Sequence, residues 1–213
     1  MKHFYRAAWG VLLISSLGAC SQAPAPQYLL TASQLAWQPY QAGQVLRFGN
    51  DRRPTVRRYT VLQATDELVK SYSAGGLFSS RQQLYAAEVK EAQVQRTDTA
   101  AGFFSACLLS PDVNEPAPNP ASASCYVNWE DFPIQAPLPV DEVDKGIAFD
   151  TAYYSATRLL PVVTLGGSTY RQVLQVKRYH YQGSGPSMVL YYAKSQGVVA
   201  FEEAKTGLWY RLP

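Results

Sequence analysis

The stretch that decides the fold is residues 156–212, ATRLLPVVTLGGSTYRQVLQVKRYHYQGSGPSMVLYYAKSQGVVAFEEAKTGLWYRL. Short turns that contain glycine divide it into runs rich in β-branched and aromatic residues. Because a parallel crossover needs about a dozen residues or more, connections this short place consecutive strands antiparallel. The sequence therefore predicts an antiparallel meander, which curves into a half-barrel or a sandwich face because an open edge must be covered. The five predicted strands are 156–165, 169–181, 187–193, 198–203 and 208–212.

Upstream of this stretch the strand signals are weaker. Residues 44–49 and 56–63 are predicted strands, joined by a turn whose Asn, Asp and Pro residues favour chain reversal. Residues 102–109, GFFSACLL, indicate a buried strand. Residues 66–73 and 82–97 fit either a helix or a strand, and we favour strands.

The predicted fold class is mainly β: an antiparallel meander, as a curved sheet or half-barrel, with one short helix as an option. Residues 28–213 form a single β-rich domain, because no internal repeat or compositional boundary divides them apart from one Pro-rich loop at 110–124.

The composition excludes several classes of protein. Of 213 residues, 47% are hydrophobic and 16% are charged, which is too apolar and too sparsely charged for a disordered chain. A single apolar run, at the N-terminus, excludes a multi-span membrane protein. The formal net charge is +3, of which Lys2 and Arg6 supply two, so residues 20–213 carry +1. This near-neutral balance gives no electrostatic basis for binding nucleic acid.

The N-terminus, MKHFYRAAWGVLLISSLGAC, has the layout of a secretory signal peptide. Two basic residues precede the apolar run Ala7–Leu17, which is shorter than the roughly 20 residues of a spanning helix. The run ends in Leu17-Gly18-Ala19-Cys20. This motif resembles the lipobox of bacterial lipoprotein precursors.

The resemblance implies that residues 1–19 are removed, that the Cys20 thiol receives a diacylglycerol, and that the new amine is acylated, for example with palmitate. Two or more acyl chains hold a protein stably on a membrane. In the Gram-negative sorting pathway an acidic residue after the cysteine favours the inner membrane. Ser21 is neutral, so we expect the outer membrane, with the protein facing the periplasm or the cell surface. Residues 20–27 then form a short lipidated tether rich in Pro and Ala.

The C-terminal part also resembles the meander of several uncharacterised Gram-negative envelope lipoproteins. The shared pattern is G-x-x-Y-x-x-V-L-x-V at 167–176, L-Y-Y-A-K-S-x-G-V-V-x-F-E at 190–202 and G-L-W-Y-R-L at 207–212. The usual form has glycine in the turn where Ser195 and Gln196 stand here. The resemblance implies a β-rich fold facing the periplasm and no known activity.

Cys107 and Cys125 remain once Cys20 is lipidated. They flank the Pro-rich loop, and the exported compartment is oxidising, so we expect them to form a disulfide. The alternative is two free buried thiols. Zinc binding is disfavoured because no His or Cys pair has ligand spacing, and we expect no metal and no cofactor.

Catalytic signals are weak. His180 is the one histidine after the leader, and it lies between two tyrosines in a predicted strand. No nucleophile elbow or phosphate-binding loop occurs. The acidic stretch 141–144 fails the spacing of a calcium loop and is interpreted as a solvated linker.

Two surface features have alternative interpretations. The basic residues Arg52, Arg53, Arg57 and Arg58 either protect a strand edge from aggregation, which we favour, or contact anionic lipid headgroups. The many aromatic residues of the C-terminal third either pack in the core, which we favour, or provide a face that binds a glycan or lipid. The candidate ligand face consists of Tyr179, Tyr181, Tyr191 and Trp209.

The function that these features favour is a lipid-anchored envelope lipoprotein without enzymatic activity, which binds a partner or ligand or has a structural role. Its partners would be the membrane, through the anchor, and an envelope protein, glycan or lipid. The alternatives are a hydrolase of envelope polymers, which needs converging polar groups in a cleft, and a carrier of apolar ligands, which needs a continuous apolar cavity.

Overall fold

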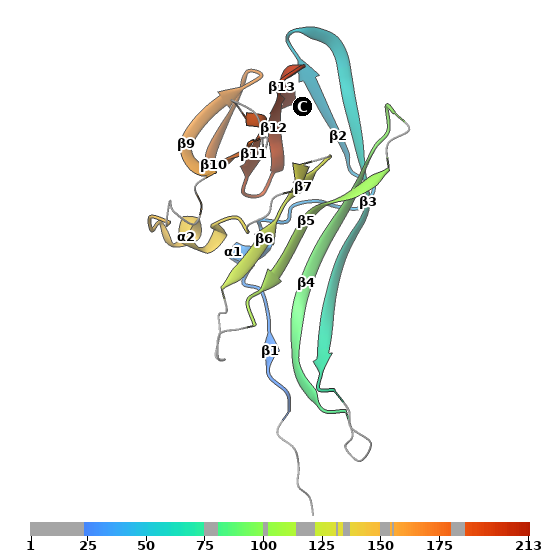
Figure 1. Cartoon of the computed structure of the whole chain (residues 1–213), viewed down its shortest axis with the longest axis vertical. Coiled ribbons are helices and arrows are strands. Elements are labelled where there is room, and N and C mark those ends of the chain that lie inside the picture. Colours follow the sequence, from blue (N-terminus) through green and yellow to red (C-terminus); the bar gives the residue numbers. More distant parts are fainter. Residues whose placement is uncertain are drawn as a thin grey trace, which may run out of the picture.

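The computed structural model describes residues 24–74, 81–99, 102–113, 122–130, 132–133, 137–149, 154, 156–179 and 186–213. One curled sheet of 11 strands wraps into a half-barrel (Figure 1). The predicted fold class, mainly antiparallel β, is confirmed. The strands are β1 Gln27–Tyr28, β2 Val45–Asn50, β3 Arg53–Tyr72, β4 Gln83–Arg96, β5 Phe103–Pro111, β6 Ala123–Tyr126, β9 Thr157–Leu165, β10 Ser168–Tyr179, β11 Pro186–Ala193, β12 Gly197–Glu203 and β13 Gly207–Arg211, while β7 Asn128–Trp129 and β8 Phe132–Pro133 form a separate hairpin.

The large sheet consists of two antiparallel meanders that meet in its middle. Strands β2 to β6 follow one another in one meander, and β9 to β13 in the other. The last strand, β13, pairs with β2, so that Tyr210 lies opposite Gly49 and Arg211 lies opposite Phe48. The order across the sheet is therefore β6-β5-β4-β3-β2-β13-β12-β11-β10-β9.

The C-terminal meander follows the expected pattern of strands and turns. Each of its five strands begins and ends within two residues of the predicted range. The β9–β10 turn consists of Gly166 and Gly167, with φ of 56° and 81°. Two successive positive φ angles are the requirement of the tight turn that matches the twist of a hairpin, so glycine is needed at both positions.

The segments for which helix and strand both remained open are strands, as we favoured. They form the long hairpin β3–β4, whose register runs from Tyr59 opposite Arg96 to Tyr72 opposite Gln83. The register shifts between Val61 and Gln63, where the extra residue bends the hairpin.

The end of this hairpin extends beyond the body of the sheet (Figure 1). Strand β2 pairs with β3 only up to Thr60, and β5 pairs with β4 only from Lys90 onward. Past these points the two strands pair with each other and, over two residues, with β1. We call residues 66–74 and 81–88 the distal hairpin.

Strand β1 lies parallel to β4 along the distal hairpin (Figure 1). Gln27 lies opposite Ala86, and the Ala86 N–H donates to the carbonyl of Pro26 at 3.0 Å. The predicted tether over 20–27 is therefore too long at its C-terminal end, because Gln27 is already a strand residue. It pairs there because β5 leaves this part of β4 uncovered. The parallel direction means that the chain enters the sheet from the side of the hairpin's end.

Aromatic side chains fill the concave side of the sheet. Phe48 and Tyr59 contact edge to face, with ring centroids 5.5 Å apart, and Tyr59 lies 4.8 Å from Trp129. Phe201 contacts Phe48 at 5.2 Å and stacks on Trp209 at 6.3 Å. All five are at most 2% exposed. Such pairs add about 0.5–1.5 kcal/mol each beyond the burial of area, so this cluster stabilises the curl of the sheet.

The described residues form two short helices, whereas the sequence analysis allowed for one. Helix α1, Ala32–Leu35, begins with a capping box between Thr31 and Gln34. Helix α2, Val140–Lys145, ends at Gly146 in the left-handed conformation. The interpretation of residues 141–144 as a solvated linker is wrong, since Asp141 and Val143 are buried in α2.

The β9–β10 turn provides a matched pair of substitutions. A Cβ on Gly166 would lie 1.9 Å from the Tyr210 ring, whereas a Cβ on Gly167 meets nothing within 4 Å. We expect Gly166→Ala to lower the free energy of unfolding by at least about 2 kcal/mol, since overpacking adds to the cost of a positive φ. Gly167→Ala carries the φ cost alone, about 1 kcal/mol. Urea denaturation measures both, and equal losses would contradict the packing of Tyr210 against this turn.

Candidate functional site

Several of the candidate residues lie outside the described residues: Cys20, His180 and Tyr181. The lipidation site and the histidine therefore stay predictions. In the described ranges, no group of three or more His, Cys, Asp or Glu side chains has the arrangement of a metal site.

Two residues of the candidate ligand face, Tyr191 and Trp209, have described side chains, and both are buried. Trp209 is 2% exposed in the main core. Tyr191 is 9% exposed in a second cluster, with Val173, Val189 and Val199, and its hydroxyl accepts a hydrogen bond from Gln175. The two side chains lie on opposite faces of the sheet. Tyr191 pairs with Ala200 and Trp209 pairs with Phe201, and these two successive residues of β12 point to opposite faces. Tyr179 is the last residue of β10.

Cys107 and Cys125 lie together in the core but as free thiols. Their Sγ atoms are 3.8 Å apart, well beyond the roughly 2.05 Å of a disulfide bond, so the predicted disulfide is absent. The two residues come from neighbouring strands, but Cys125 lies opposite Leu109 and only diagonal to Cys107. The alternative from the sequence analysis, two buried thiols, describes the structure.

The surroundings of these thiols are apolar and closed. Both cysteines are 0% exposed, and the Tyr192 hydroxyl donates to the Cys107 Sγ at 3.4 Å and to the carbonyl of Trp37. The hydrogen bond to Cys107 and burial together raise the pKa of the Cys125 thiol well above its ordinary value. Because both thiols are fully buried, a reagent in solvent does not reach them in the folded protein.

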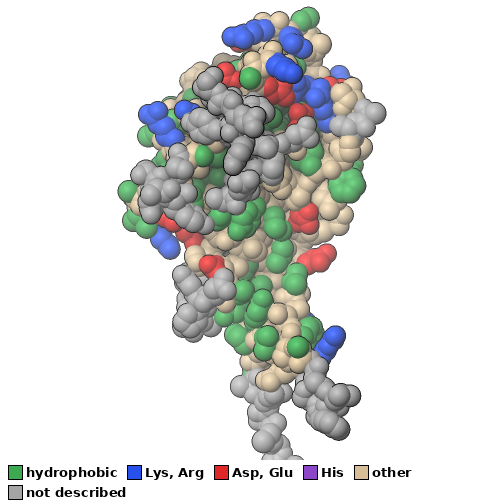
Figure 2. All heavy atoms as spheres, in the orientation of Figure 1, with side chains coloured by type: hydrophobic (Ala, Val, Ile, Leu, Met, Phe, Trp, Pro, Cys, Tyr) green, Lys and Arg blue, Asp and Glu red, His purple; other side chains and the backbone are tan. Residues whose placement is uncertain are grey.

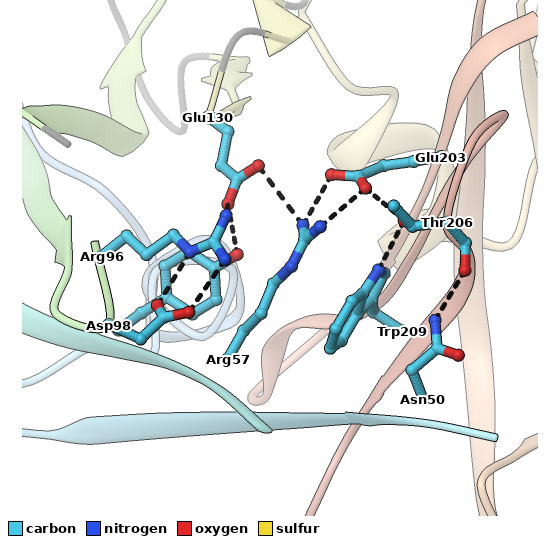
Figure 3. Close-up of polar contacts among 9 residues, drawn as sticks. Asn50, Arg57, Arg96, Asp98, Glu130, Glu203, Thr206 and Trp209 are labelled. Carbon is cyan, nitrogen blue, oxygen red and sulfur yellow. Dashed lines mark hydrogen bonds and ion pairs between the residues drawn. The ribbon is translucent and has the colours of Figure 1, made fainter. Parts of the chain in front are cut away.

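A cluster of charged side chains lies at the end of the aromatic core (Figure 3). Arg57, on β3, forms a two-pronged ion pair with Glu203 at the end of β12, with N–O distances of 2.6 and 2.8 Å. Arg57 also lies 3.5 Å from Glu130, which in turn lies 3.3 Å from Arg96. Arg96 makes a second two-pronged pair with Asp98, both distances being 2.8 Å. We call these five residues the charged clamp; it holds two cations and three anions.

Arg57 is the centre of the clamp and is 7% exposed. Its guanidinium lies over the Trp209 ring at 4.0 Å and over Phe201 at 5.4 Å, where the negative face of each ring attracts the cation. The favoured interpretation of the four arginines as edge protection is therefore wrong for Arg57. Strand β3 has neighbours on both sides, and Arg57 shares its inward face with Tyr59 and Val61.

Further side chains fix the anions of the clamp. Glu203 accepts a hydrogen bond from Thr206, whose hydroxyl accepts from the Trp209 indole at 2.8 Å. Glu130 accepts from the Tyr59 hydroxyl and has a φ of 52°, a left-handed conformation that is unfavourable for a side chain of this size. The ion pairs thus hold Glu130 in a strained turn between β7 and β8.

The protonation pattern of the clamp favours a structural role. Burial alone would raise the pKa of Glu203, but the hydrogen bonds from Arg57 and Thr206 and the charge of Arg57 lower it below its ordinary value. A lowered pKa does not suit Glu203 to the role of the protonated acid in a hydrolase that uses two carboxylates. Since Arg57 pairs with both Glu130 and Glu203, the clamp instead links β3, the β7–β8 turn and β12.

A polar depression of about 460 Å³ lies between β5, β6 and α2. Asp141 lines it, but its carboxylate already accepts hydrogen bonds from Gln34 at 3.0 Å and from the Ala123 N–H at 2.8 Å. Nearby, Asp144 accepts from the Trp37 indole at 3.1 Å and pairs with Lys194 at 2.7 Å. Both acids therefore bind α2 to the rest of the protein.

Comparisons with profiles of protein families, with curated proteins and with solved structures gave no match to this chain. In the part of the chain that the structure describes, neither helix reaches the length and apolar character needed to span a bilayer.

The clamp predicts a large effect of removing its central cation. Arg57→Met leaves the partly buried Glu203 carboxylate without a cation, while Glu130 keeps its pair with Arg96, so the free energy of unfolding at pH 7 should fall by roughly 3 kcal/mol. Arg58→Met, on the exposed face of the same strand, should change it by about 0.5 kcal/mol or less. Chemical denaturation measures both.

The loss in Arg57→Met should also depend on pH. Because pairing lowers the folded pKa of Glu203, its contribution is present above the unfolded pKa, about 4.3, and disappears as pH falls through the lower folded value. The difference between native protein and variant should therefore shrink in acid, and a difference that grew would contradict the pairing.

The burial of the two thiols can be tested by counting the cysteines that react with a thiol reagent. Native mature protein should react with no equivalent of a thiol reagent, and protein in denaturant should react with two, Cys107 and Cys125. Three reactive thiols would mean that Cys20 carries no thioether, and none would mean that a disulfide forms.

Proposed function

We propose that this protein is a lipid-anchored lipoprotein of the bacterial outer membrane, whose β-rich body has a binding or structural role at the membrane surface. Two features support the proposal. The first is the Leu17-Gly18-Ala19-Cys20 motif after an apolar leader. The second is the direction in which the chain enters the sheet.

The path of β1 is the observation that carries the proposal. Because β1 is parallel to β4 and pairs at Ala86, the residues before it continue toward the end of the distal hairpin. Cys20 precedes Pro24, the first described residue, by four positions, which span at most about 14 Å. An acylated Cys20 would therefore hold the distal hairpin close to the bilayer rather than let the body move freely on a long linker.

The body is better suited to presenting a surface than to transporting an apolar ligand. A carrier needs a continuous apolar cavity, but here the concave side of the sheet is occupied by Phe48, Tyr59, Trp129 and Phe201. Anchoring raises the effective concentration of such a surface for partners in the same membrane. Its partner is another envelope protein, a glycan or a lipid.

The neutral Ser21 after the acylated residue supports sorting to the outer membrane rather than retention at the inner membrane. The β2–β3 turn lies at the end of the molecule opposite β1 (Figure 1), so the basic residues near that turn would point away from the lipid to which Cys20 is attached. Contact between those arginines and lipid headgroups is therefore disfavoured.

The anchor is tested by Cys20→Ala in the organism or in a Gram-negative host. We expect the variant to move from the membrane fraction to the soluble fraction and to lose the mass of its acyl groups, because no nucleophile remains to form the thioether. Ser21→Ala, one residue further along, should keep both the acyl mass and the membrane association. Unchanged membrane association and mass in Cys20→Ala would refute the anchor.

A further inference from the structure

The distal hairpin exposes large apolar side chains on both of its faces. Leu68 is 43% exposed and Val69, its neighbour on the opposite face, is 48% exposed. Tyr72 and Leu84, nearer the end, are 50% and 48% exposed. A strand pair in water has at least one polar face, so apolar residues on both faces indicate a surface that is covered in the working protein.

Figure 2 shows that hydrophobic side chains gather on the elongated end of the molecule, over the distal hairpin. Tyr85 lies among them and packs edge to face on Tyr28 of β1, with ring centroids 5.9 Å apart. This contact joins β1 to the distal hairpin, so the segment that leads to Cys20 and the apolar surface form one unit.

The charges toward the end of this surface have one sign. From residue 68 to residue 87 the sequence contains Lys70 and Arg81 and no acidic residue. Both cations are on exposed positions of the distal hairpin. The nearest carboxylates are those of Glu67, next to Leu68 in sequence, and of Glu88, opposite Leu68 on β4, at the end of the surface nearer the body. Apolar side chains with cations at their margin suit the boundary between anionic headgroups and acyl chains.

We infer that the distal hairpin is a second membrane contact, which inserts Leu68, Val69, Tyr72 and Leu84 into the interfacial region of the bilayer to which Cys20 is anchored. The inference rests on the proposed function, because the anchor brings this end of the protein to the lipid. Acyl chains alone hold a protein on the membrane but leave it free to tilt. Apolar residues on two faces of a rigid hairpin restrict that tilt and set the orientation of the body.

The contact is testable in the acylated mature protein, in vesicles of phosphatidylethanolamine and phosphatidylglycerol. A cysteine at Val69 carries an environment-sensitive fluorophore, and the same label at Val162, an equally small and 58% exposed side chain on β9, is the matched control. The buried Cys107 and Cys125 do not compete for the label. We expect the label at position 69 to gain emission, shift to the blue and be quenched by spin-labelled lipid, and the label at position 162 to remain in water.

A second variant separates lipid contact from folding. The protein labelled at Leu84→Cys also carries Leu68→Ser, Val69→Ser and Tyr72→Ser, none of which is in the core. It should keep its circular dichroism and its flotation with vesicles but lose quenching at position 84. Without acyl chains, each exposed apolar residue should change partitioning by about fivefold, so the three serines together should lower it on the order of 100-fold.

A third form distinguishes failure of this inference from failure of the proposed function. Cys20→Ala protein with an N-terminal hexahistidine is held on nickel-chelating lipid, which replaces acylation. Quenching at position 69 in this form would support the hairpin contact even if Cys20 proves unacylated in the cell. A label that stays in water in both the acylated and the hexahistidine forms would overturn the inference and would indicate that a protein partner covers this surface.

Discussion

The curl of the sheet depends on the aromatic side chains that fill its concave side. Phe48, Tyr59, Trp129 and Phe201 are each fully buried, and each comes from a different strand. A sheet of this width would otherwise expose one apolar face along its whole length. Because the rings contact one another in edge-to-face and tilted pairs, they fix how far β2, β3 and β12 can bend toward the small β7–β8 hairpin.

The two ends of the molecule have opposite chemical character. At one end the charged clamp closes the core with ion pairs and a cation stacked on Trp209. At the other end the sheet narrows to two strands with apolar side chains on both faces. From Arg57 to Tyr72 the β3 strand spans about 50 Å, so a membrane contact at the distal hairpin would carry the clamp far into the aqueous compartment. On this proposal the body would keep a defined orientation and would be available to partners at a fixed distance from the membrane.

The sequence predicted the C-terminal meander well because its turns are marked by glycine and its strands by β-branched and aromatic runs. It did not predict helix α2, since a stretch with acids at three of its four positions, 141–144, resembles a solvated linker, and the hydrogen bonds of Asp141 with Gln34 and of Asp144 with Trp37 are tertiary contacts. The burial of Arg57 was missed although a signal was present. Arg57, Tyr59 and Val61 have the spacing of one strand face, and that face is the core. The strands of the distal hairpin were favoured from the sequence, but its apolar surface was missed, because the neighbours Leu68 and Val69 point to opposite faces and break the alternation of polar and apolar residues. The thiol pair shows another limit: flanking a loop places two cysteines near each other, but the diagonal register leaves their sulfur atoms unbonded.

The pairing of β13 with β2 has a consequence for how the chain becomes folded. The last strand to be synthesised occupies the seam between the two meanders, and its partner lies more than 150 residues earlier in the sequence. The two meanders cannot join until residue 211 has been synthesised, because β13 pairs with β2 through Tyr210 and Arg211. Contacts between residues so distant in sequence form slowly. A nascent chain with this topology stays loosely structured during synthesis. Under the proposed export, a chain in this state would pass through a narrow translocation channel and would complete its sheet once the C-terminus is on the far side.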